Sequence, residues 1–475
     1  MKSRIARALA SPAARLRIVP FVVACPMFLQ NLDSSVMGTA LPAIADSLHA
    51  DVLHLNLAIT SYLLSLVLFL PASAWLADRF GPRRVFCAAV FLFSFASALC
   101  GIATTLGQLI SFRLLQGAGG AMMVPVGRLI LLRTIPATQM IMAMVWFTVP
   151  GGIGRLMGPL VGGAIVTVVS WRWIFLVNIP FGLAGVLAAL YFIDKDLPGD
   201  SEGAARFDPL GLVLMAVALG GLLGALEMVG KGLLPWPGVV ALAGVGVLAL
   251  WVYLRRSAAQ DEPLIDFKVF RFITYRASVL GGAPVRAAIG ATPFLLPLLF
   301  QVGFGMPPLE AGLLTVATAV GSLGSRGIVT AAVRRLGYRR LLITSSAVTS
   351  LFYGAYALFT PHTPHAVIFI VLLIAGMSNA LTLVTLATTG FTEIPRNRMG
   401  HATALSTMAQ QVSVALGVTA AASLVELAHH LRSSGGELAA GDFRPALLVV
   451  ALLPFISAIA FARLPKASVL AEDAP

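Results

Sequence analysis

Charged residues are scarce in this sequence. Only 11% of its 475 residues are Asp, Glu, Lys or Arg, against about 25% in an ordinary globular domain, and 58% are hydrophobic. The mean hydropathy is +0.91. Apolar runs of about 20 residues, the length that crosses a bilayer as a helix, recur along the chain. The composition therefore excludes an ordinary soluble domain and indicates a polytopic membrane protein.

Cysteine and recognisable reaction chemistry are also scarce. Cys25, Cys87 and Cys100 lie inside apolar runs, so no disulfide framework is indicated. The histidines show no metal-ligand spacing, no G-x-x-x-x-G-K-[ST] phosphate loop occurs, and acids and nucleophiles do not cluster. We therefore expect no metal, no cofactor and no enzyme activity. A membrane enzyme or sensor would need a catalytic cluster or a soluble domain, and neither is visible.

Positive charge is plentiful, but its distribution does not suggest a nucleic-acid partner. The net charge is +13, and the basic residues cluster at the ends of apolar runs. If the N-terminus is cytoplasmic, most of the 33 Lys and Arg fall on the cytoplasmic side. The outer side then holds Arg172, Lys231, Arg432 and Arg444. The positive-inside rule therefore predicts that both termini are cytoplasmic, in a cell membrane that we take as an inner membrane.

The apolar runs predict an all-α fold with fourteen transmembrane helices. Helices are expected because every backbone group in the hydrocarbon must pair within its own segment, and the alternation typical of a barrel is absent. The runs lie at about residues 18–42, 55–76, 85–105, 108–131, 140–168, 173–193, 210–229, 236–254, 277–301, 309–332, 340–359, 366–388, 403–426 and 445–463.

Two predicted cytoplasmic loops, at 194–209 and 255–276, bracket the seventh and eighth runs. They divide the chain into an N-terminal six-helix bundle at 1–193, a middle part with loops and two linker helices at 194–276, and a C-terminal six-helix bundle at 277–475.

A weak internal echo supports two repeated six-helix blocks. LADRFGPRR at 76–84 and AVRRLGYRR at 332–340 place a glycine before a basic pair at the same offset. Repeats of this kind are one signature of secondary transporters.

Five stretches of the first half stand out as motifs: FLQNLDSSVMGTALP (28–42), ASAWLADRFGPRR (72–84), RLLQGAGGAMMVP (113–125), GIGRLMGPLVGG (152–163) and WRWIFLVNIPFG (171–182). In this order they resemble the signatures of the major facilitator superfamily and of its fourteen-helix drug:proton antiporter branch. The resemblance implies two six-helix pseudo-repeats with an inserted helix pair. It also implies proton-coupled export of small lipophilic or amphipathic compounds by alternating access, which is multidrug efflux.

The chain departs from these signatures at three positions. The loop motif usually opens with glycine where this chain has Ala74, and its second copy has Arg334 in place of an expected acid. The helix-5 motif rarely carries an arginine at the place of Arg155, and this arginine puts a purely cationic drug preference in question.

Ionisable residues inside the membrane are expensive and mark candidate functional sites. Asp33, about 15 residues into the first helix, and Arg113, about 5 residues into the descending fourth helix, reach the same depth at ~1.5 Å per residue. Arg155 in the fifth helix falls at this level too. We predict that Asp33 and Arg113 couple proton and substrate binding. The alternative is a static buried pair that fixes helix packing.

The fifth helix carries the stretch that resembles an antiporter motif. Gly154, Gly158 and Gly162 are four apart, so they form a bare stripe that lets another helix approach closely. Pro159 has no amide hydrogen and frees the carbonyl of Arg155, so a bend is expected there. We assign to this motif Gly154, Arg155, Gly158, Pro159, Gly162 and Gly163. Helix packing alone is the alternative role of the stripe.

The loop motif predicts a cytoplasmic gate. Positive-inside orientation explains its arginines but not Asp78, which can pair with basic groups or with a helix N-terminus and so latch one conformation. The residues of this gating loop are Asp78, Arg79, Gly81, Arg83 and Arg84.

Three residues are candidate substrate contacts: Arg155, Arg286 and Gln116. For Arg286, a structural pairing with an acid is the alternative. Since arginines outnumber Asp33 in the expected cavity, an exporter of an organic anion or of a metal chelate, such as a citrate-like metabolite, is the alternative function. A proton-coupled importer is disfavoured by the antiporter motif. The expected partners are a small-molecule substrate, protons and the lipid bilayer. A periplasmic adaptor and a lone monomer both remain open.

Two further features are interpreted as belonging to the membrane interface. Glu227 and Glu426 near the outer ends of their helices read as interface residues, with a second proton site as the alternative. The aromatic WRWIF at 171–175 reads as an interfacial belt.

Overall fold

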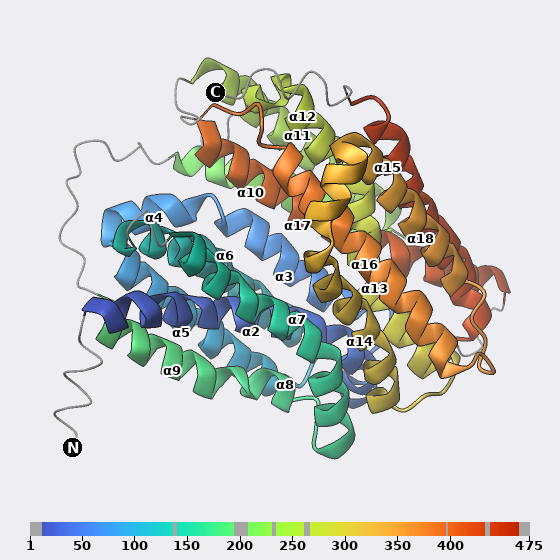
Figure 1. Ribbon diagram of the computed structural model, residues 1–475. Helices are drawn as coiled ribbons and strands as arrows, with labels where there is room; N and C mark the ends of the chain where they lie inside the picture. The colour runs from blue at the N-terminus through green and yellow to red at the C-terminus, as the bar shows by residue number, and fades with distance from the viewer. Residues whose placement is uncertain are drawn as a thin grey trace. The chain divides into compact units, whose positions relative to one another are not determined.

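The computed structural model describes residues 12–135, 140–193, 208–229, 234–260, 267–395, 398–432 and 438–464. Within these residues the chain is helical and contains no strand (Figure 1). Among the described residues, ten helices are long and apolar enough to cross a membrane, or up to eleven if the bent pair α14 and α15 is one span. The predicted loop at 194–209 lies outside the described residues up to 207.

The helical elements of the described residues occur in the following chain order. They are α2 (Pro12–Leu48), α3 (Asn56–Phe69), α4 (Ala72–Phe80), α5 (Pro82–Gly101), α6 (Leu106–Thr134), α7 (Met140–Val168), α8 (Trp173–Leu176), α9 (Asn178–Phe192), α10 (Pro209–Met228), α11 (Trp236–Ala259), η2 (Phe267–Arg271), α12 (Ile273–Arg276), η3 (Ala277–Gly281), α13 (Ala283–Leu298), η4 (Leu299–Gly303), α14 (Pro308–Gly324), η5 (Ser325–Gly327), α15 (Val329–Tyr356), α16 (His365–Thr389), α17 (Met399–Arg432) and α18 (Ala440–Phe461).

The chain divides into two compact units. The first comprises Met1–Ala50, Leu57–Ala216 and Gln260–Leu264, and the second comprises Asp51–Asn56, Val217–Ala259 and Ile265–Pro475. In the first unit α2 packs along α7 and also contacts α6 and α9. A polar side chain near the middle of α2 can therefore meet groups from several neighbouring helices.

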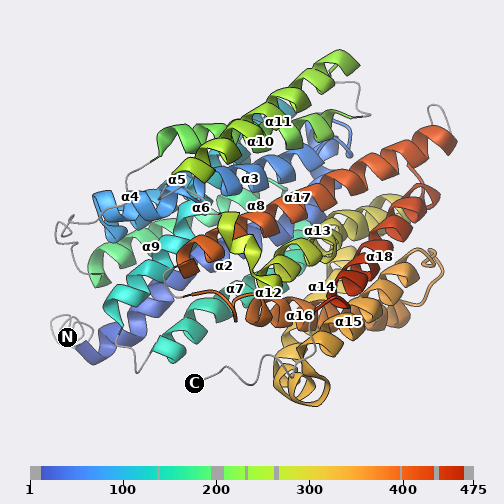
Figure 2. The ribbon, with the colours of Figure 1, turned by 90° about the horizontal axis from the view of Figure 1, so that it is seen from above.

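The second unit repeats one packing feature of the first. There, α13 packs along α17 and α18, and α15 lies beside α16 and α18 (Figures 1 and 2). Contact between α13 and α17 is close, since a Cβ on Gly417 would lie 1.9 Å from the carbonyl oxygen of Ala287. Thus α2 in the first unit and α13 in the second each pack along a glycine-bearing helix later in the same unit.

The echoed loop motif has the same backbone conformation in both units. Gly81, between α4 and α5, has φ 90°, and Gly337, inside α15, has φ 71°. Both values lie in the left-handed region that glycine adopts without strain. The arginine two residues later donates to the carboxyl end of the last complete helix of its own unit: Arg83 to the Leu190 carbonyl of α9, and Arg339 to the Ala462 carbonyl at the end of α18.

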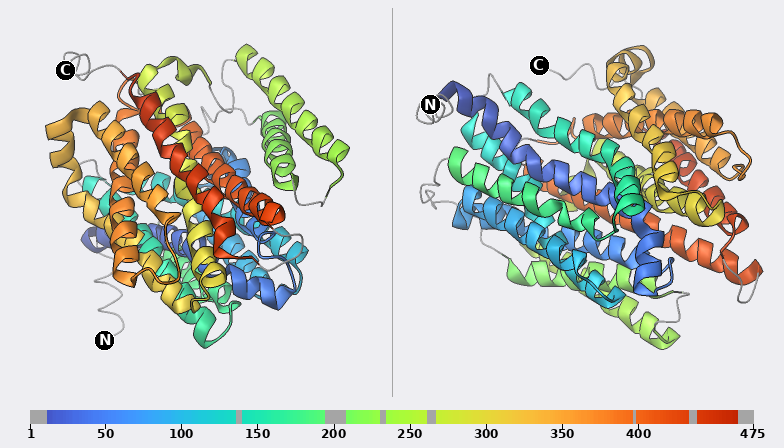
Figure 3. Two further views of the ribbon diagram at one scale, coloured as in Figure 1. Left: turned by 90° about the vertical axis from the view of Figure 1, so that its right-hand side faces the viewer. Right: turned by 90° about the horizontal axis from the view of Figure 1, so that it is seen from below.

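The linker helices α10 and α11 form an antiparallel pair (Figures 2 and 3). They approach closely where two glycines meet, because a Cβ on Gly221 would lie 2.9 Å from the Gly246 Cα. The side chain of Glu227, near the end of α10, is 4% exposed.

Candidate functional site

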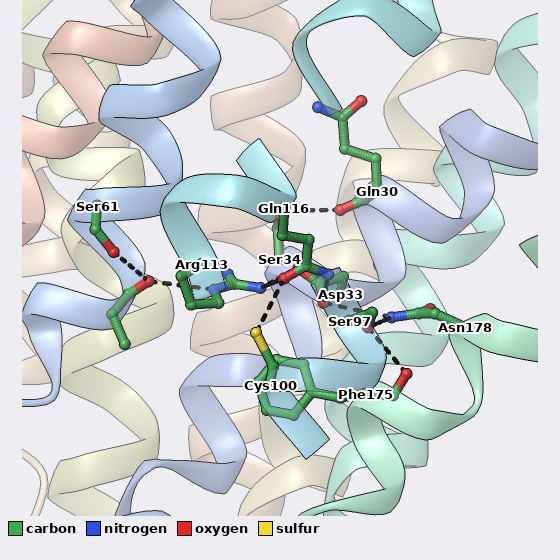
Figure 4. Close-up of polar contacts among 11 residues, drawn as sticks. Gln30, Asp33, Ser34, Ser61, Ser97, Cys100, Arg113, Gln116, Phe175 and Asn178 are labelled. Carbon is green, nitrogen blue, oxygen red and sulfur yellow. Dashed lines mark hydrogen bonds and ion pairs between the residues drawn. The ribbon is translucent and has the colours of Figure 1, made fainter. Parts of the chain in front are cut away.

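The centre of the first unit holds a buried ion pair. Asp33 on α2 is 5% exposed and Arg113 on α6 is 1% exposed. The Arg113 Nη1 donates to the Asp33 Oδ2 at 2.6 Å (Figure 4). Asp33 and Arg113, which we predicted to lie at the same depth in the membrane, are therefore in direct contact.

Gln116, one turn after Arg113 on α6, completes a triangle with this pair. Its Nε2 donates to Asp33 Oδ1 at 3.1 Å, and its Oε1 accepts from Arg113 Nη1 at 2.8 Å. Figure 4 shows both α6 side chains directed at Asp33. Gln116 was expected as a substrate contact. The structure places it fully buried within the Asp33 cluster, where its hydrogen bonds orient both charges.

Arg113 has three further neighbours on its own unit. Its Nε donates to the Ala58 carbonyl at 3.2 Å. Its guanidinium lies over the Tyr62 ring, 4.3 Å from the centroid, and 5.7 Å from the centroid of Phe175. An arginine face on an aromatic ring is attracted by the ring quadrupole, more strongly where water is excluded. Arg113 thus keeps a carbonyl and an aromatic partner that do not depend on the charge of Asp33.

Sequence reasoning did not single out Asn178, the first residue of α9. It is fully buried, and its Nδ2 lies 3.5 Å from Asp33 Oδ1 and 3.0 Å from Ser97 Oγ. Ser97 in turn donates to the Phe175 carbonyl at 2.9 Å. We refer to Asp33, Arg113, Gln116, Asn178 and Ser97 as the Asp33 cluster.

The prediction that WRWIF at 171–175 forms an interfacial belt is wrong for Trp171 and Phe175, which are buried, and Phe175 contacts the Asp33 cluster. Trp173 is 52% exposed, but Trp171 is 4% and Phe175 1% exposed. A belt residue faces the membrane interface, whereas Phe175 packs against Arg113. WRWIF is the start of the stretch WRWIFLVNIPFG (171–182), which also contains Asn178. The only signal available in the sequence was an asparagine in an apolar run, where a polar side chain needs a partner.

Arg155 lies on α7 and does not join the Asp33 cluster. Its side chain is exposed, and its Nη2 donates to the Asn31 Oδ1 at 2.8 Å. The backbone carbonyl of Arg155, freed by Pro159, accepts a hydrogen bond from Ser35 Oγ at 3.0 Å. The open carbonyl expected from the proline is thus satisfied by a hydroxyl of the neighbouring helix α2.

The glycine stripe of α7 packs against α2. A Cβ would lie 2.5 Å from the Phe28 carbonyl oxygen if placed on Gly154, and 2.3 Å from the Ser35 Cβ if placed on Gly158. On Gly162 it would lie 2.9 Å from Val36 Cγ1. Real Cβ atoms do not approach this closely, so the stripe permits the contact between α7 and α2.

The predicted gating loop lies at the junction of α4 and α5. Asp78 is ion-paired with Arg133, in the last turn of α6, at 2.7 Å, and both side chains are about half exposed. Arg79 and Arg84 are exposed. An exposed pair contributes about 0–1 kcal/mol to stability. The Asp78 pair therefore adds little to stability and can be broken at low cost.

Arg286 lies on α13 of the second unit and is 5% exposed. Its Nη1 donates to the carbonyls of Ser278 at 2.9 Å and Val279 at 3.4 Å. Both acceptors belong to η3, a π-helical turn. Among the described residues, no acid pairs with Arg286 and its buried Nε has no hydrogen-bond partner. Its visible role is therefore to bind the carbonyls of the preceding turn.

Comparison with known proteins decides the family. Residues 23–418 match the model of the Major Facilitator Superfamily. The chain belongs to this superfamily. It is 37% identical over 427 residues to multidrug resistance protein MdtD of Pectobacterium carotovorum subsp. carotovorum, covering 90% of this chain and 91% of that protein. It is equally identical, 37% over 449 residues, to the protein of that name from Escherichia coli, covering 94% of each.

A solved structure shows the same fold. The crystal structure of an auto inhibited POT family peptide transporter aligns with a TM-score of 0.67 over 95% of this chain and 97% of that one, at 15% identity. The predicted family is therefore confirmed, as is the all-helical major facilitator fold. This protein is a multi-pass membrane transporter rather than an enzyme.

Proposed function

We propose that the protein is a proton-coupled antiporter that exports small lipophilic or amphipathic compounds by alternating access. The buried Asp33–Arg113 pair carries this proposal. Donors from two other helices, α6 and α9, bind the Asp33 carboxylate, so a proton on this intramembrane acid would weaken its contacts with both helices. The names of the MdtD relatives support multidrug efflux as the physiological setting.

The geometry supplies a route from proton binding to helix movement. A proton on Asp33 removes the negative charge that Arg113 faces at 2.6 Å. Arg113 is not stranded, because the Ala58 carbonyl and the Gln116 Oε1 still accept from it. The attraction between α2 and α6 falls while the cation stays satisfied. Two arrangements of similar free energy are what a transport cycle needs.

Proteoliposomes that enclose a pH dye test the proposal. Addition of a lipophilic cation is expected to move protons in the wild-type protein, and Asp33→Asn should abolish this response. Asp46→Asn is the matched control, since Asp46 lies on the same helix but is exposed. Proton flux that persists in Asp33→Asn would overturn the coupling role of Asp33, and the absence of flux with every compound would overturn antiport.

The alternative substrate class is an organic anion or a metal chelate, and the exposed Arg155 is the observation that favours it. Arg113 no longer counts toward an excess of positive charge, because Asp33 neutralises it. Arg155→Gln should weaken transport of anions and leave cations unaffected if this class is the substrate. Equal effects on both charges would assign Arg155 to the contact with Asn31 alone.

The remaining architecture is part of the same proposal. We infer fourteen spans, arranged as six-helix bundles at 1–193 and 277–475 around a middle part at 194–276, with both termini cytoplasmic in an inner membrane. The residues Asp78, Arg79, Gly81, Arg83 and Arg84 act as the cytoplasmic gate, and the α7 glycines and Pro159 act as the antiport motif. Purification in mild detergent distinguishes a monomer from a complex with a periplasmic adaptor.

A further inference from the structure

A second buried acid lies on the linker helix α10, outside the Asp33 cluster. Glu227 is 4% exposed, and its carboxylate contacts two fully buried polar side chains, Asn56 and Thr419. The Asn56 Nδ2 donates to Glu227 Oε2 at 2.9 Å. The Thr419 hydroxyl contacts Glu227 Oε1. All three residues belong to the second unit, so the contact joins α10 to α17 and to the segment Asp51–Asn56.

The Thr419 hydroxyl has two acceptors within reach but only one hydrogen. Its Oγ1 contacts Glu227 Oε1 and also lies 3.0 Å from the carbonyl oxygen of Ala415. A hydroxyl has one donor and two acceptor lone pairs, and its hydrogen rotates to suit its surroundings. When Glu227 is a carboxylate, the hydroxyl donates to it. When Glu227 is protonated, the acid donates to Thr419, and the Thr419 hydrogen turns to the Ala415 carbonyl.

Both protonation states are therefore accommodated with the same heavy-atom positions. In each state the Thr419 hydrogen has an acceptor. The Asn56 amide donates to Oε2 in both, because the carbonyl oxygen of a protonated acid still accepts. A purely structural acid would need only one of these arrangements. A fully buried threonine that can donate to the acid or accept from it is suited to a group that gains and loses a proton.

We propose that Glu227 is a second proton-binding site, on the linker helix pair. This inference rests on the proposed antiport and extends it: the pair α10–α11 takes part in proton handling through Glu227. The proposal replaces the interface reading of Glu227, because an interface residue keeps its charge in contact with water whereas this side chain is buried.

Other titratable groups occur on the elements that meet at this site. They are Asp51 and His54 on the segment before α3, and Glu426, His429, His430 and Arg432 on α17. Glu426 lies two turns beyond Thr419 on the same face of α17, so it is the acid most easily confused with Glu227 in a measurement. It serves as the matched control.

Infrared difference spectroscopy on the full-length protein in lipid, stepped in pH without any substrate, tests the proposal directly. We expect the carbonyl-stretch signal of a protonated carboxylic acid to lose a component in Glu227→Gln and to keep that component in Glu426→Gln and Asp46→Asn. If Glu227→Gln retains the complete signal, Glu227 does not bind a proton and the proposal is wrong.

A second pair of variants keeps Glu227 in place. Thr419→Val removes the hydroxyl, whereas Thr419→Ser retains it. Thr419→Val removes a hydrogen bond from both forms of Glu227, but the bond to the carboxylate is charge-assisted and stronger than the bond to the neutral acid, so the acid signal should persist to a higher pH than in the wild type. Thr419→Ser should match the wild type. An unchanged midpoint in Thr419→Val would contradict the proposed exchange of donor and acceptor.

These results separate this inference from the proposed function. If Asp33→Asn abolishes substrate-driven proton flux while Glu227→Gln keeps the complete infrared signal, antiport stands and the Glu227 site falls. If no compound drives proton flux while Glu227→Gln loses the signal, Glu227 binds a proton and antiport is wrong.

Discussion

Arg113 is the residue on which most contacts of the Asp33 cluster converge. It meets a carboxylate, an amide, a backbone carbonyl and two aromatic rings, all with less than a tenth of its surface exposed. The aromatic contacts can be tested separately, because they do not depend on the charge of Asp33.

Tyr62 provides that test. Tyr62→Phe keeps the ring 4.3 Å from the Arg113 guanidinium and should leave stability nearly unchanged. Tyr62→Leu removes the ring quadrupole and should lower the free energy of unfolding by about 0.5–2 kcal/mol beyond the packing change. Thermal unfolding in detergent measures both. Equal losses in the two variants would show that the hydroxyl, not the ring, matters.

The positions of charged residues along helices were predictable at this scale, but their directions were not. Counting 1.5 Å per residue brought Asp33 and Arg113 to one depth, and they touch. The same count placed Arg155 beside them. Yet Asn31 and Ser35, which contact Arg155, lie on the face of α2 opposite Asp33, because residues two apart are about 200° apart on a helix. Counting residues along a helix gives the depth of a side chain in the membrane but not the direction in which that side chain points.

In helix α7, the backbone hydrogen bond lost at one proline is replaced by a hydrogen bond from a neighbouring helix. Pro159 lacks the amide that would bind the Arg155 carbonyl, and Ser35 of α2 donates to that carbonyl instead. The glycine stripe makes this contact possible, since a side chain at Gly158 would collide with Ser35. The missing backbone hydrogen bond at Pro159 and the close approach of α2 at Gly158 are therefore two parts of one packing arrangement.

A double-mutant cycle measures the link between Ser35 and Pro159. Ser35→Ala leaves the Arg155 carbonyl without its donor and should destabilise the protein by about 1–3 kcal/mol. Pro159→Ala restores the helical amide, so Ser35→Ala in that background should cost less. Thermal unfolding of the four proteins gives the interaction energy. An interaction energy of zero would show that the hydroxyl and the proline are independent.

Gly158→Ala tests the close approach itself. The added Cβ would lie 2.3 Å from the Ser35 Cβ, so α2 and α7 must separate, and both the midpoint of thermal unfolding and transport should fall. Gly220→Ala on α10 is the control, because a Cβ there meets nothing within 4 Å. The control should be neutral or stabilising by up to about 1 kcal/mol, since alanine favours helix over glycine. Equal behaviour of the two variants would remove the steric explanation.

Two other features at the element scale were not predicted from the sequence. Two π-helical turns, η3 and η4, flank the helix α13 that carries Arg286, and both contact α18. The location of Asn178 in the Asp33 cluster likewise required the packing of α9 on α2.

The whole molecule repeats one contact in its two units. Arg83 and Arg339 each follow a left-handed glycine by two residues, and each donates to the carboxyl end of the last complete helix of its own unit. A cation at a helix carboxyl end contributes about 0.3–1 kcal/mol. The echo seen in two short sequences therefore corresponds to a shared cap, which strengthens the case for two related halves.

Arg83→Gln and Arg339→Gln should have similar small effects on thermal stability, and their effects should add in the double variant because the two contacts share no residue. Arg→Lys variants at both positions should lose less, since the charge at the helix end remains. Thermal unfolding of the full-length protein measures the series. A large effect at one position alone would show that the repeated geometry conceals unequal roles.

The Asp33 pair has an electrical consequence. As an ion pair it carries no net charge, but once Asp33 binds a proton the cluster becomes a single positive charge within the membrane. Moving one charge across a membrane potential changes the free energy by about 2.3 kcal/mol per 100 mV. A potential that is negative inside the cell would therefore pull the protonated form toward the cytoplasm and leave the proton-free form unaffected. The voltage, independently of the pH gradient, would then set the direction in which the protonated transporter prefers to open.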